Sequence, residues 1–132
     1  MEQQDIAQEE INERIAADFF TILYHVKDLE TAKKMMHSEF VNHPAHRGKD
    51  RSAYIDAINK QVFEKFPDFN VCIKRITTEA DLVWIQSFEQ HSPGEEHKMA
   101  IDIWRIQDGL IAEHWDNVDI LHDIEVCQEY NC

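Results

Sequence analysis

Glycine is scarce in this chain of 132 residues, which contains only Gly48, Gly94 and Gly109. The three lie far apart, so they cannot form the glycine-rich loops that hold nucleotide phosphates or dinucleotides. A nucleophile elbow of the form Gly-x-Ser-x-Gly is also absent from the sequence. We therefore expect no nucleotide cofactor.

The chain also has few cysteines. Cys72, Cys127 and Cys132 make an odd count, and none of them belongs to a Cys-x-x-Cys pair. Paired spacing of that kind marks zinc sites and redox motifs. We therefore expect reduced thiols that take no part in the chemistry.

Basic residues are few as well: 13 Lys and Arg stand against 26 Asp and Glu, which gives a formal net charge of −13. Such a charge repels nucleic acids and anionic membranes, so neither is expected as a partner. No apolar run approaches the length that spans a bilayer. The N-terminus lacks the basic start and apolar stretch of a signal peptide, which favours a cytoplasmic location.

The composition is that of a soluble globular protein, with 43% hydrophobic and 30% charged residues. The length fits a single domain, residues 1–132. Its core is expected over about residues 8–120, between acidic N-terminal and C-terminal tails.

Apolar residues in the first half of the chain repeat at helical spacing. This pattern predicts an amphipathic helix over about residues 7–26 and a short second helix over 29–36. A third helix is expected to start near residue 50 and to end before Pro67, which terminates it. Residues 38–43 are interpreted as a short strand or an extended turn.

From Phe69 onward apolar and polar residues alternate, which is the period of a β-strand. Residues 82–88 are rich in Val, Ile, Trp and Phe, and Ser92-Pro93-Gly94-Glu95 marks a turn. Three helices followed by four longer strands joined by hairpin turns indicate an α+β fold. We expect a curved antiparallel sheet packed on three N-terminal helices.

The segment Met99–Val118 carries the most information, because it is predicted to form a β-hairpin around Asp108-Gly109. If Gln107–Gly109 form a three-residue loop with Gly109 in a bulge, Ile106 pairs with Leu110. Six side chains of the hairpin then share one face, with Asp102 opposite His114: Ala100, Asp102, Trp104, Ala112, His114 and Asp116.

A two-residue loop gives the opposite result. It pairs Gln107 with Leu110, and Asp102 then lies on the face of Trp115, away from Asp116. We favour the three-residue loop, because apolar, polar and acidic groups together on one concave face describe a lined cavity.

Asp102 and Asp116 are the best candidates for chemistry. Two carboxyl groups close together in an apolar cavity do not both ionise easily, so one pKa rises toward neutrality, as a general base beside a carbonyl requires. His114 would lie between them and could hold or relay a proton. The alternatives are carboxylates that face water, or a hydrogen-bonded cluster that serves only structure or ligand binding. Ile101 and Ile103 flank Asp102 and argue against its exposure.

Aromatic side chains could line this cavity and stack a planar ligand, although ordinary core packing explains Trp84 and Phe88 equally well. Tyr24 and Tyr54 could reach the cavity from the helices, and His43 could lie at its entrance. The residues predicted to line the pocket are therefore His43, Trp104, Trp84, Phe88, Tyr24 and Tyr54.

Metal binding is not predicted. His43 and His46 flank Pro44-Ala45 and could be combined with His114 as ligands. The eight histidines are scattered, however, and neither His-Glu-x-x-His nor cysteine-paired spacing occurs. We expect His46 on a surface loop instead.

Four short motifs carry a family resemblance: Asn42-His43-Pro44, Phe66-Pro67-Asp68, Asp102-Ile103-Trp104-Arg105 and Glu113-His114-Trp115-Asp116. Over about residues 8–120 the chain resembles SnoaL-like proteins of the nuclear transport factor 2-like superfamily. The resemblance implies a cone-shaped curved sheet and helices that enclose an apolar pocket. It also implies a homodimer through the outer face of the sheet, where Trp115 would need cover.

Polyketide cyclases of this kind catalyse an intramolecular aldol condensation without metal or cofactor, and an aspartate in the last long strand acts as acid and base. Asp116 resembles that residue by position. Those cyclases carry a histidine where this chain has Asp102, so a polyketide substrate is not implied. The superfamily also contains isomerases, dehydratases, hydrolases and proteins without known activity.

The sequence thus predicts a small cofactor-independent enzyme that transfers protons on a small apolar carbonyl compound, by aldol condensation or cyclisation, isomerisation or dehydration. The alternative is a module of the same fold that binds a small ligand or dimerises without catalysis. Asp102 and Asp116 close together at a cavity would favour the enzyme. A cavity filled by Trp84, Phe88 and Trp104 would favour the module.

Overall fold

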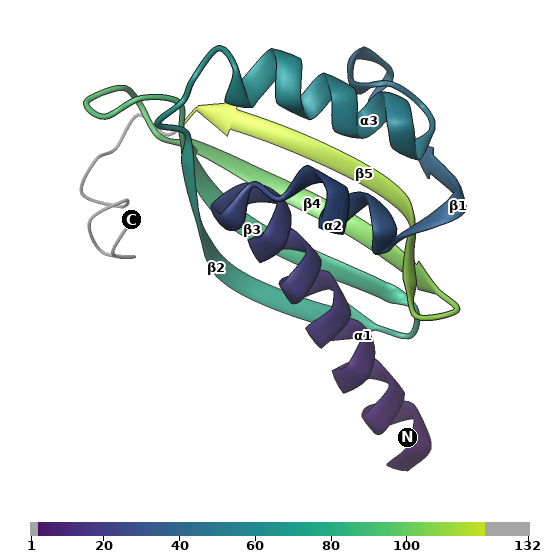
Figure 1. Cartoon of the computed structure of the whole chain (residues 1–132). Helices are drawn as coiled ribbons and strands as arrows, with labels where there is room; N and C mark the ends of the chain where they lie inside the picture. Colours follow the sequence, from purple (N-terminus) through teal and green to yellow (C-terminus); the bar gives the residue numbers. More distant parts are fainter. Residues whose placement is uncertain (1–2, 121–132) are drawn as a thin grey trace.

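The computed structural model describes residues 3–120 and places the helices over one face of a five-stranded sheet (Figure 1). Among these residues, no helix combines the length and the apolar character needed to cross a membrane. The elements in chain order are α1 (Gln3–Thr21), a π-helical turn (Ile22–Val26), α2 (Leu29–Lys34), β1 (Met36–Asn42), a 3-10 turn (Ala45–Arg47), α3 (Arg51–Ile58), a second π-helical turn (Asn59–Phe63), β2 (Asn70–Glu79), β3 (Leu82–Gln90), β4 (Lys98–Gln107) and β5 (Leu110–Ile120).

The sheet has the order β1-β5-β4-β3-β2. Strands β2 to β5 form consecutive antiparallel pairs, whereas β1 joins β5 in the parallel direction. The sheet is therefore mixed, and the wholly antiparallel sheet predicted from the sequence is wrong at this edge. The reason is that β1 leads into α3 and not into a hairpin turn, so it pairs with a strand from the far end of the described chain.

Two aspartates determine where the shorter helices begin. Asp28 accepts a hydrogen bond from the backbone N–H of Thr31 at the start of α2, and Asp50 accepts one from that of Ala53 at the start of α3. Such N-caps satisfy backbone donors that the first turn leaves without a partner. The predicted second helix is too long, because β1 already begins at Met36.

The hydrophobic core lies between the helices and the inner face of the sheet. Ring contacts join the two layers, as where Phe19 of α1 meets Trp104 of β4 edge-on at 5.1 Å between ring centroids. Burying side chains of this size is the main favourable term in folding. The largest fully buried side chains are Trp104, Tyr54, Phe19, Phe20, Leu23, Met36, Ile85, Ile111, His114, Val83 and Ser87.

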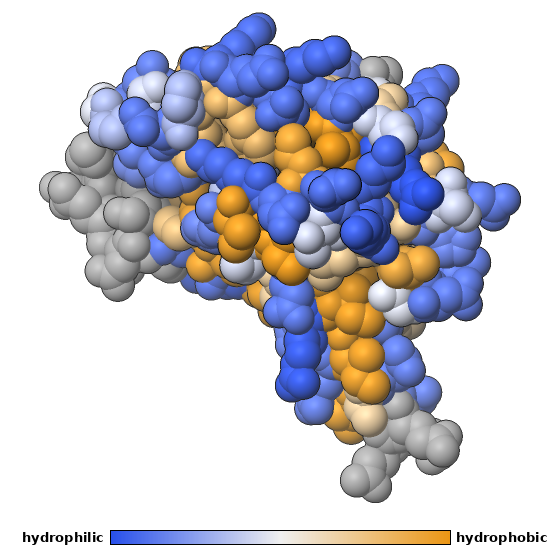
Figure 2. Space-filling model, viewed as in Figure 1, coloured by the Kyte–Doolittle hydropathy of each residue, from blue (hydrophilic) through white to orange (hydrophobic). Residues whose placement is uncertain are grey.

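The N-terminal part of α1 projects beyond the sheet (Figure 1). Figure 2 shows apolar side chains along this projecting part, between hydrophilic ones. Ile6 and Ile11 are 45% and 52% exposed. The core therefore holds only the C-terminal part of α1, where Ala16, Phe19 and Phe20 are buried.

The turn of the C-terminal hairpin has two residues, Asp108 and Gly109, whose φ angles are 55° and 74°. Gln107 consequently pairs with Leu110, and the predicted three-residue loop is wrong. Asp-Gly suits a two-residue turn, because a turn with positive φ at both central positions matches the twist of the strands.

A β-bulge reverses the effect of the shorter turn. The register of β4 against β5 shifts between Arg105 and Ile106, where β5 contains one residue more, Ala112. One extra residue turns every later side chain of the strand to the other face. Asp102 therefore lies opposite Asp116, and the two carboxyl groups share a face as predicted, although through a different register.

We expect Gly109→Ala to lower the free energy of unfolding by about 1 kcal/mol, because alanine is strained at this positive φ. A Cβ at this position would meet no atom within 4 Å, so the loss comes from the backbone alone. Gly48→Ala should destabilise more, because its Cβ would lie 2.7 Å from the backbone carbon of Ala53. Urea unfolding of the two variants measures the difference, and equal stabilities would contradict it.

Candidate functional site

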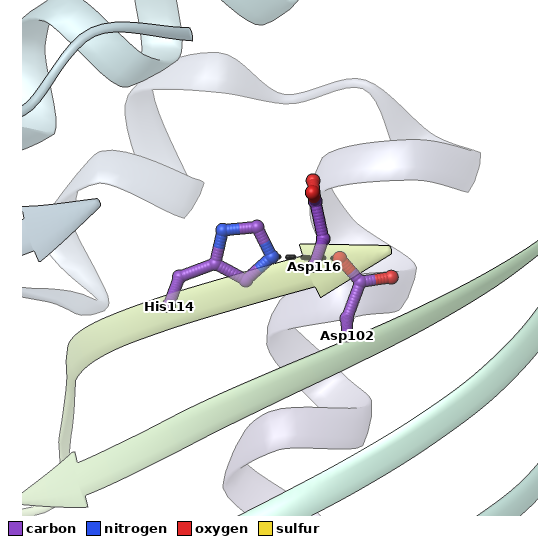
Figure 3. A group of neighbouring side chains, drawn as sticks. All are labelled: Asp102, His114 and Asp116. Carbon is purple, nitrogen blue, oxygen red and sulfur yellow. Dashed lines mark hydrogen bonds and ion pairs between the residues drawn. The ribbon is translucent and has the colours of Figure 1, made fainter. Parts of the chain in front are cut away.

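Asp102, His114 and Asp116 rise from the same face of β4 and β5 (Figure 3). Asp102 and His114 are 6% and 1% exposed, and Asp116 is half-buried. One nitrogen or oxygen atom of each residue lies within 4.8 Å of those of the other two. The structure thus brings together the three residues that the sequence analysis selected for chemistry.

A chain of hydrogen bonds runs from the edge strand to β4 through His114. The Nδ2 atom of Asn42 donates to the carbonyl oxygens of Pro44 and Gly48, at 3.0 and 2.8 Å, so its Oδ1 faces the ring. That oxygen accepts the hydrogen bond from Nδ1–H of His114 at 2.7 Å. The other ring nitrogen, Nε2, lies 2.7 Å from Oδ1 of Asp102.

This arrangement determines how many protons the pair holds. Because Nδ1 of His114 must carry a proton to donate to Asn42, the hydrogen bond between Nε2 and Asp102 contains one more. That proton lies either on the ring, beside a carboxylate, or on the carboxyl group, beside a neutral ring. The pair of Asp102 and His114 is thus a store for one shared proton.

Aromatic rings hold His114 in place. Trp104 stacks on the imidazole with 3.9 Å between ring centroids and 22° between planes, and Tyr54 meets it edge-on at 5.5 Å. Both aromatic residues are almost fully buried. The imidazole therefore cannot turn without displacing core side chains, which keeps the hydrogen-bond geometry constant.

A cavity of about 30 Å³ lies beside these groups, which is space for about one water molecule. The sequence predicted an apolar pocket, but the wall of this cavity also includes one arginine, three carboxyl groups and two tyrosines. The lining residues are Phe20, Tyr24, Arg47, Tyr54, Ile58, Val62, Phe69, Val71, Glu89, Ala100, Asp102 and Asp116.

Glu89 and Arg47 are cavity residues that the sequence analysis missed. Burial in the first place, and then the negative charge of Asp102, raise the pKa of Glu89 from 4.5 to about 7, while Arg47 opposes the rise. The alternation of β3 contains a signal for this position, since Val83 and Ile85 face the core and Glu89 follows at an even spacing.

The pKa of Asp116 is also raised, chiefly by burial. The charge of Asp102 acts in the same direction, while His114 and Arg47 act against it. A carboxyl group with a raised pKa is a stronger base once ionised, and it exchanges protons closer to neutral pH. The cavity thus contains two such carboxyl groups, on β3 and β5.

Tyr24 and Tyr54 meet in the cavity wall with 3.4 Å between their hydroxyl oxygens. Burial raises the pKa of both phenols well above the usual value, and the charge of Asp102 adds to the rise. Both therefore stay neutral and can donate hydrogen bonds. One hydroxyl donates to the other, which leaves one phenolic proton for a ligand.

Two aromatic residues predicted for the pocket lie elsewhere. Trp84 is 44% exposed on the outer face of the sheet, opposite Ile103. Phe88 belongs to the same alternating set of β3, and the Lys74 ammonium lies 5.7 Å from the centre of its ring. The prediction is wrong because it assigned the opposite face to the side chains of β3.

His43 and Trp104 were also predicted for the pocket. His43 stacks on Trp115 with 4.8 Å between ring centroids and bonds to Glu113, so it belongs to the outer face and not to a pocket entrance. Trp104 packs behind His114 in the core without lining the cavity. His46 is exposed in its short turn, as predicted.

Asp102, His114 and Asp116 are also the described residues best placed to hold a metal ion, a possibility that spacing along the chain does not reveal. Two carboxylates and an imidazole are ligands that many divalent metals accept. The Nε2 atom of His114, however, already bonds to Asp102, and Nδ1 bonds to Asn42. A metal would have to displace one of these hydrogen bonds. Among the predicted thiols, Cys72 is free, and Cys127 and Cys132 lie outside the described residues.

Comparison with known proteins supports a common fold. The family model of the SnoaL-like domain matches residues 16–114. A search of curated protein sequences gives no match. A candidate polyketide cyclase from Acidithiobacillus ferrooxidans superposes with a TM-score of 0.70 at 13% identity, covering 91% of this chain and 94% of that one.

Two further structures have the same architecture. IdmH from Streptomyces antibioticus, a candidate polyketide cyclase, has a TM-score of 0.65 at 23% identity, covering 78% of this chain and 91% of that one. A candidate ketosteroid isomerase from Kribbella flavida has a TM-score of 0.69 at 13% identity, covering 87% and 82%. At these identities the likeness establishes the fold.

We expect Glu89→Gln to stabilise the protein at pH 8, by roughly 1–3 kcal/mol, and to have no such effect at pH 4.5. A glutamate whose pKa rises from 4.5 to about 7 on folding favours the folded state while it is protonated. This contribution is complete below the unfolded pKa and is lost as the pH rises through 7. Chemical unfolding at both pH values tests the sign, with the exposed Glu96→Gln as the matched control.

We expect the purified protein to contain much less than one equivalent of transition metal, because both ring nitrogens of His114 are already engaged in hydrogen bonds, with Asn42 and with Asp102. Elemental analysis of protein prepared without chelator measures the content. A stoichiometric metal that is lost in His114→Ala, together with a lower melting temperature after chelation, would contradict this expectation.

Proposed function

Because the chain belongs to the SnoaL-like family, we propose that it is a cofactor-independent enzyme that moves protons on a small carbonyl compound held in the cavity. The observation that carries the proposal is the position of Asp116. Its carboxyl group has a raised pKa, lines the cavity and lies beside the single proton shared by Asp102 and His114. A base and a proton store thus face the same space.

In the proposed reaction, Asp116 removes a proton from the carbon beside the carbonyl group, and the C–H electron pair forms an enolate. In an isomerisation, Asp116 returns the proton at another carbon, and every group ends as it began. In an aldol step, the enolate carbon attacks a second carbonyl, and the alkoxide takes the proton shared by Asp102 and His114. Asp116 then returns its proton to that pair.

Neutral hydroxyl groups would assist the first step. Negative charge develops on the carbonyl oxygen as the proton leaves, and fixed donors aimed at that charge lower the barrier. The pair of Tyr24 and Tyr54 offers one such donor, since both line the cavity, their raised pKa values keep them protonated, and one hydroxyl donates to the other. Two of the structural relatives are a candidate ketosteroid isomerase and a candidate polyketide cyclase, and these names support an activity on carbonyl compounds.

The alternative is a module of the same fold that binds a small ligand or dimerises without catalysis, and the size of the cavity bears on both functions. The cavity of about 30 Å³ is too small for a ligand of more than a few atoms unless the helices move apart. A binding module needs the cavity but not the base. Loss of Asp116 would therefore abolish the reaction of an enzyme, but it would leave the ligand binding of a module intact.

We also propose a homodimer through the outer face of the sheet. The outer side chains of β3, β4 and β5 include Trp84, Ile101, Ile103 and Trp115, and Trp84 is 44% exposed. A groove of about 500 Å³ crosses this face beside Trp84 and Ile101. A second copy would cover the apolar surface, and a twofold axis would bring the same patch to both sides.

Asp116→Asn is expected to reduce proton exchange on a substrate by about 10²–10⁴-fold, because the amide keeps the shape and removes the base. Acetone and other carbonyl compounds of a few atoms are incubated with protein in D₂O, and deuterium at the carbon beside the carbonyl is followed by NMR. The exposed Asp56→Asn, which makes the same chemical change, should retain the wild-type rate.

The outcome that removes Asp116 from the mechanism is undiminished exchange in Asp116→Asn. If the wild-type protein binds members of the panel but exchanges none of their protons, the binding module is the better description.

Trp84→Glu is expected to convert the dimer to a monomer, because it places a charge in the centre of the apolar patch. Light scattering after size exclusion measures the mass at micromolar concentration. Val26→Glu is the control, since Val26 is 65% exposed at the end of the first helical segment and not on the sheet. A monomeric wild-type protein would contradict the proposed dimer.

A further inference from the structure

Arg47 occupies an unusual position for a charged side chain. It ends the 3-10 turn Ala45–Arg47 between β1 and α3, and its side chain lines the cavity. The loop around it is held by Asn42, whose Nδ2 atom donates to the carbonyl oxygens of Pro44 and Gly48. Asn42 is the residue that also bonds to His114, so one amide positions both Arg47 and the proton store.

The guanidinium group of Arg47 has a donor without an acceptor. Its Nη1 atom is buried and makes no hydrogen bond, and among the side chains that the structure describes, at residues 5–44 and 46–117, no carboxylate oxygen lies within 4.0 Å of this side chain. A buried donor of this kind is unfavourable unless something accepts from it, and more so when it belongs to a cation. The atom faces a cavity that is otherwise rich in groups for proton transfer.

The carboxyl groups of the cavity do not supply the missing acceptor. Arg47 lowers the pKa of Glu89 and of Asp116, so its charge reaches both, yet neither is bonded to it. Asp102 is committed to His114. The acids on β3, β4 and β5 and the arginine of the loop therefore face one another across the cavity.

We propose that Arg47 binds a carboxylate of the substrate, which makes the ligand of this site a carbonyl compound that carries a carboxylate. A guanidinium group presents parallel N–H donors that match the two oxygens of a carboxylate. With that end held at Arg47, and with the helices moved apart to widen the cavity, the remainder of the molecule would extend toward Asp102 and Asp116, where its acidic C–H bond would meet the base. The inference rests on the proposed function for the reaction, but the binding step stands without it.

Binding of a carboxylate should be coupled to a proton. A bound anion offsets the charge of Arg47, which otherwise opposes protonation of Glu89, so the bound state favours the protonated form. The charged groups that act on Glu89 are Asp102, Arg47, Lys98 and Asp116, with Arg47 and Lys98 opposing the two acids. His91 lies 4.0 Å from Glu89 at the end of β3. Affinity for the anion should consequently rise as the pH falls through about 7.

The test compares small carboxylates with their neutral amides, because the cavity admits only a few atoms. Formate against formamide and acetate against acetamide are titrated into the full-length protein at pH 6 and pH 8, and binding is followed by NMR of the cavity residues. We expect the wild-type protein to bind each carboxylate at least about tenfold more tightly than its amide, and more tightly at pH 6.

Arg47→Gln should abolish the preference for the anion, whereas Arg47→Lys should retain part of it. Lys49→Gln is the matched control, because it removes one exposed positive charge from the same loop and should leave binding unchanged. The two-dimensional amide spectrum of each variant verifies folding, and Arg47→Lys keeps the test valid if Arg47→Gln does not fold.

Equal affinity for acid and amide in the wild-type protein, or a preference that survives in Arg47→Gln, would overturn the inference. Neither result bears on proton exchange by Asp116, so failure of this proposal is distinguishable from failure of the proposed function.

Discussion

The two hydrogen bonds of the His114 ring are the constraint on which the site depends. They tie together three strands and one loop: Asn42 at the end of β1, His114 on β5 and Asp102 on β4. Because β1 lies at the edge of the sheet and pairs with β5 in the parallel direction, its position relies on such contacts as well as on the strand ladder. The rings of Trp104 and Tyr54 exclude water from these bonds, which makes them stronger and leaves a single proton free to move between two heavy atoms.

The cavity concentrates carboxyl groups in a molecule that already carries a large negative charge. A net charge of −13 should make every added carboxylate unfavourable, yet three carboxyl groups line one small cavity. The site tolerates them because Asp102 forms a hydrogen bond with His114, and because burial raises the pKa of Asp116 and raises that of Glu89 to about 7. Arg47 is the cationic side chain of the wall, and its charge limits how far both pKa values rise.

Local signals in the sequence were enough for the helices and for the α+β order, since caps such as Asp28 and Asp50 act within one turn of chain. They were not enough for features set by distant parts of the chain. The direction of β1 depends on β5, and the place of Arg47 depends on how its loop packs against the cavity. The alternation of β3 could have placed Glu89 in the cavity, because it shares a face with Val83 and Ile85. The prediction instead assigned Trp84 and Phe88, on the other face, to the pocket. Asp102 and Asp116 share a face as expected, although the turn is one residue shorter than predicted. The bulge at Ala112, which the prediction did not include, compensates for the shorter turn.

The bulge at Ala112 has a consequence for how this strand pair could change during evolution. A three-residue turn without the bulge at Ala112 and a two-residue turn with it present the same face of β5, but they differ by a shift of two residues of β5 along β4. In the first arrangement His114 would lie opposite Asp102; in the second, which the molecule adopts, Trp104 lies opposite His114 and Asp116 opposite Asp102. Exchanging one arrangement for the other leaves the orientation of the β5 side chains unchanged. It changes which residue of β4 lies opposite each of them. A change from one turn to the other at constant chain length would therefore exchange the Asp-Asp contact for an Asp-His contact.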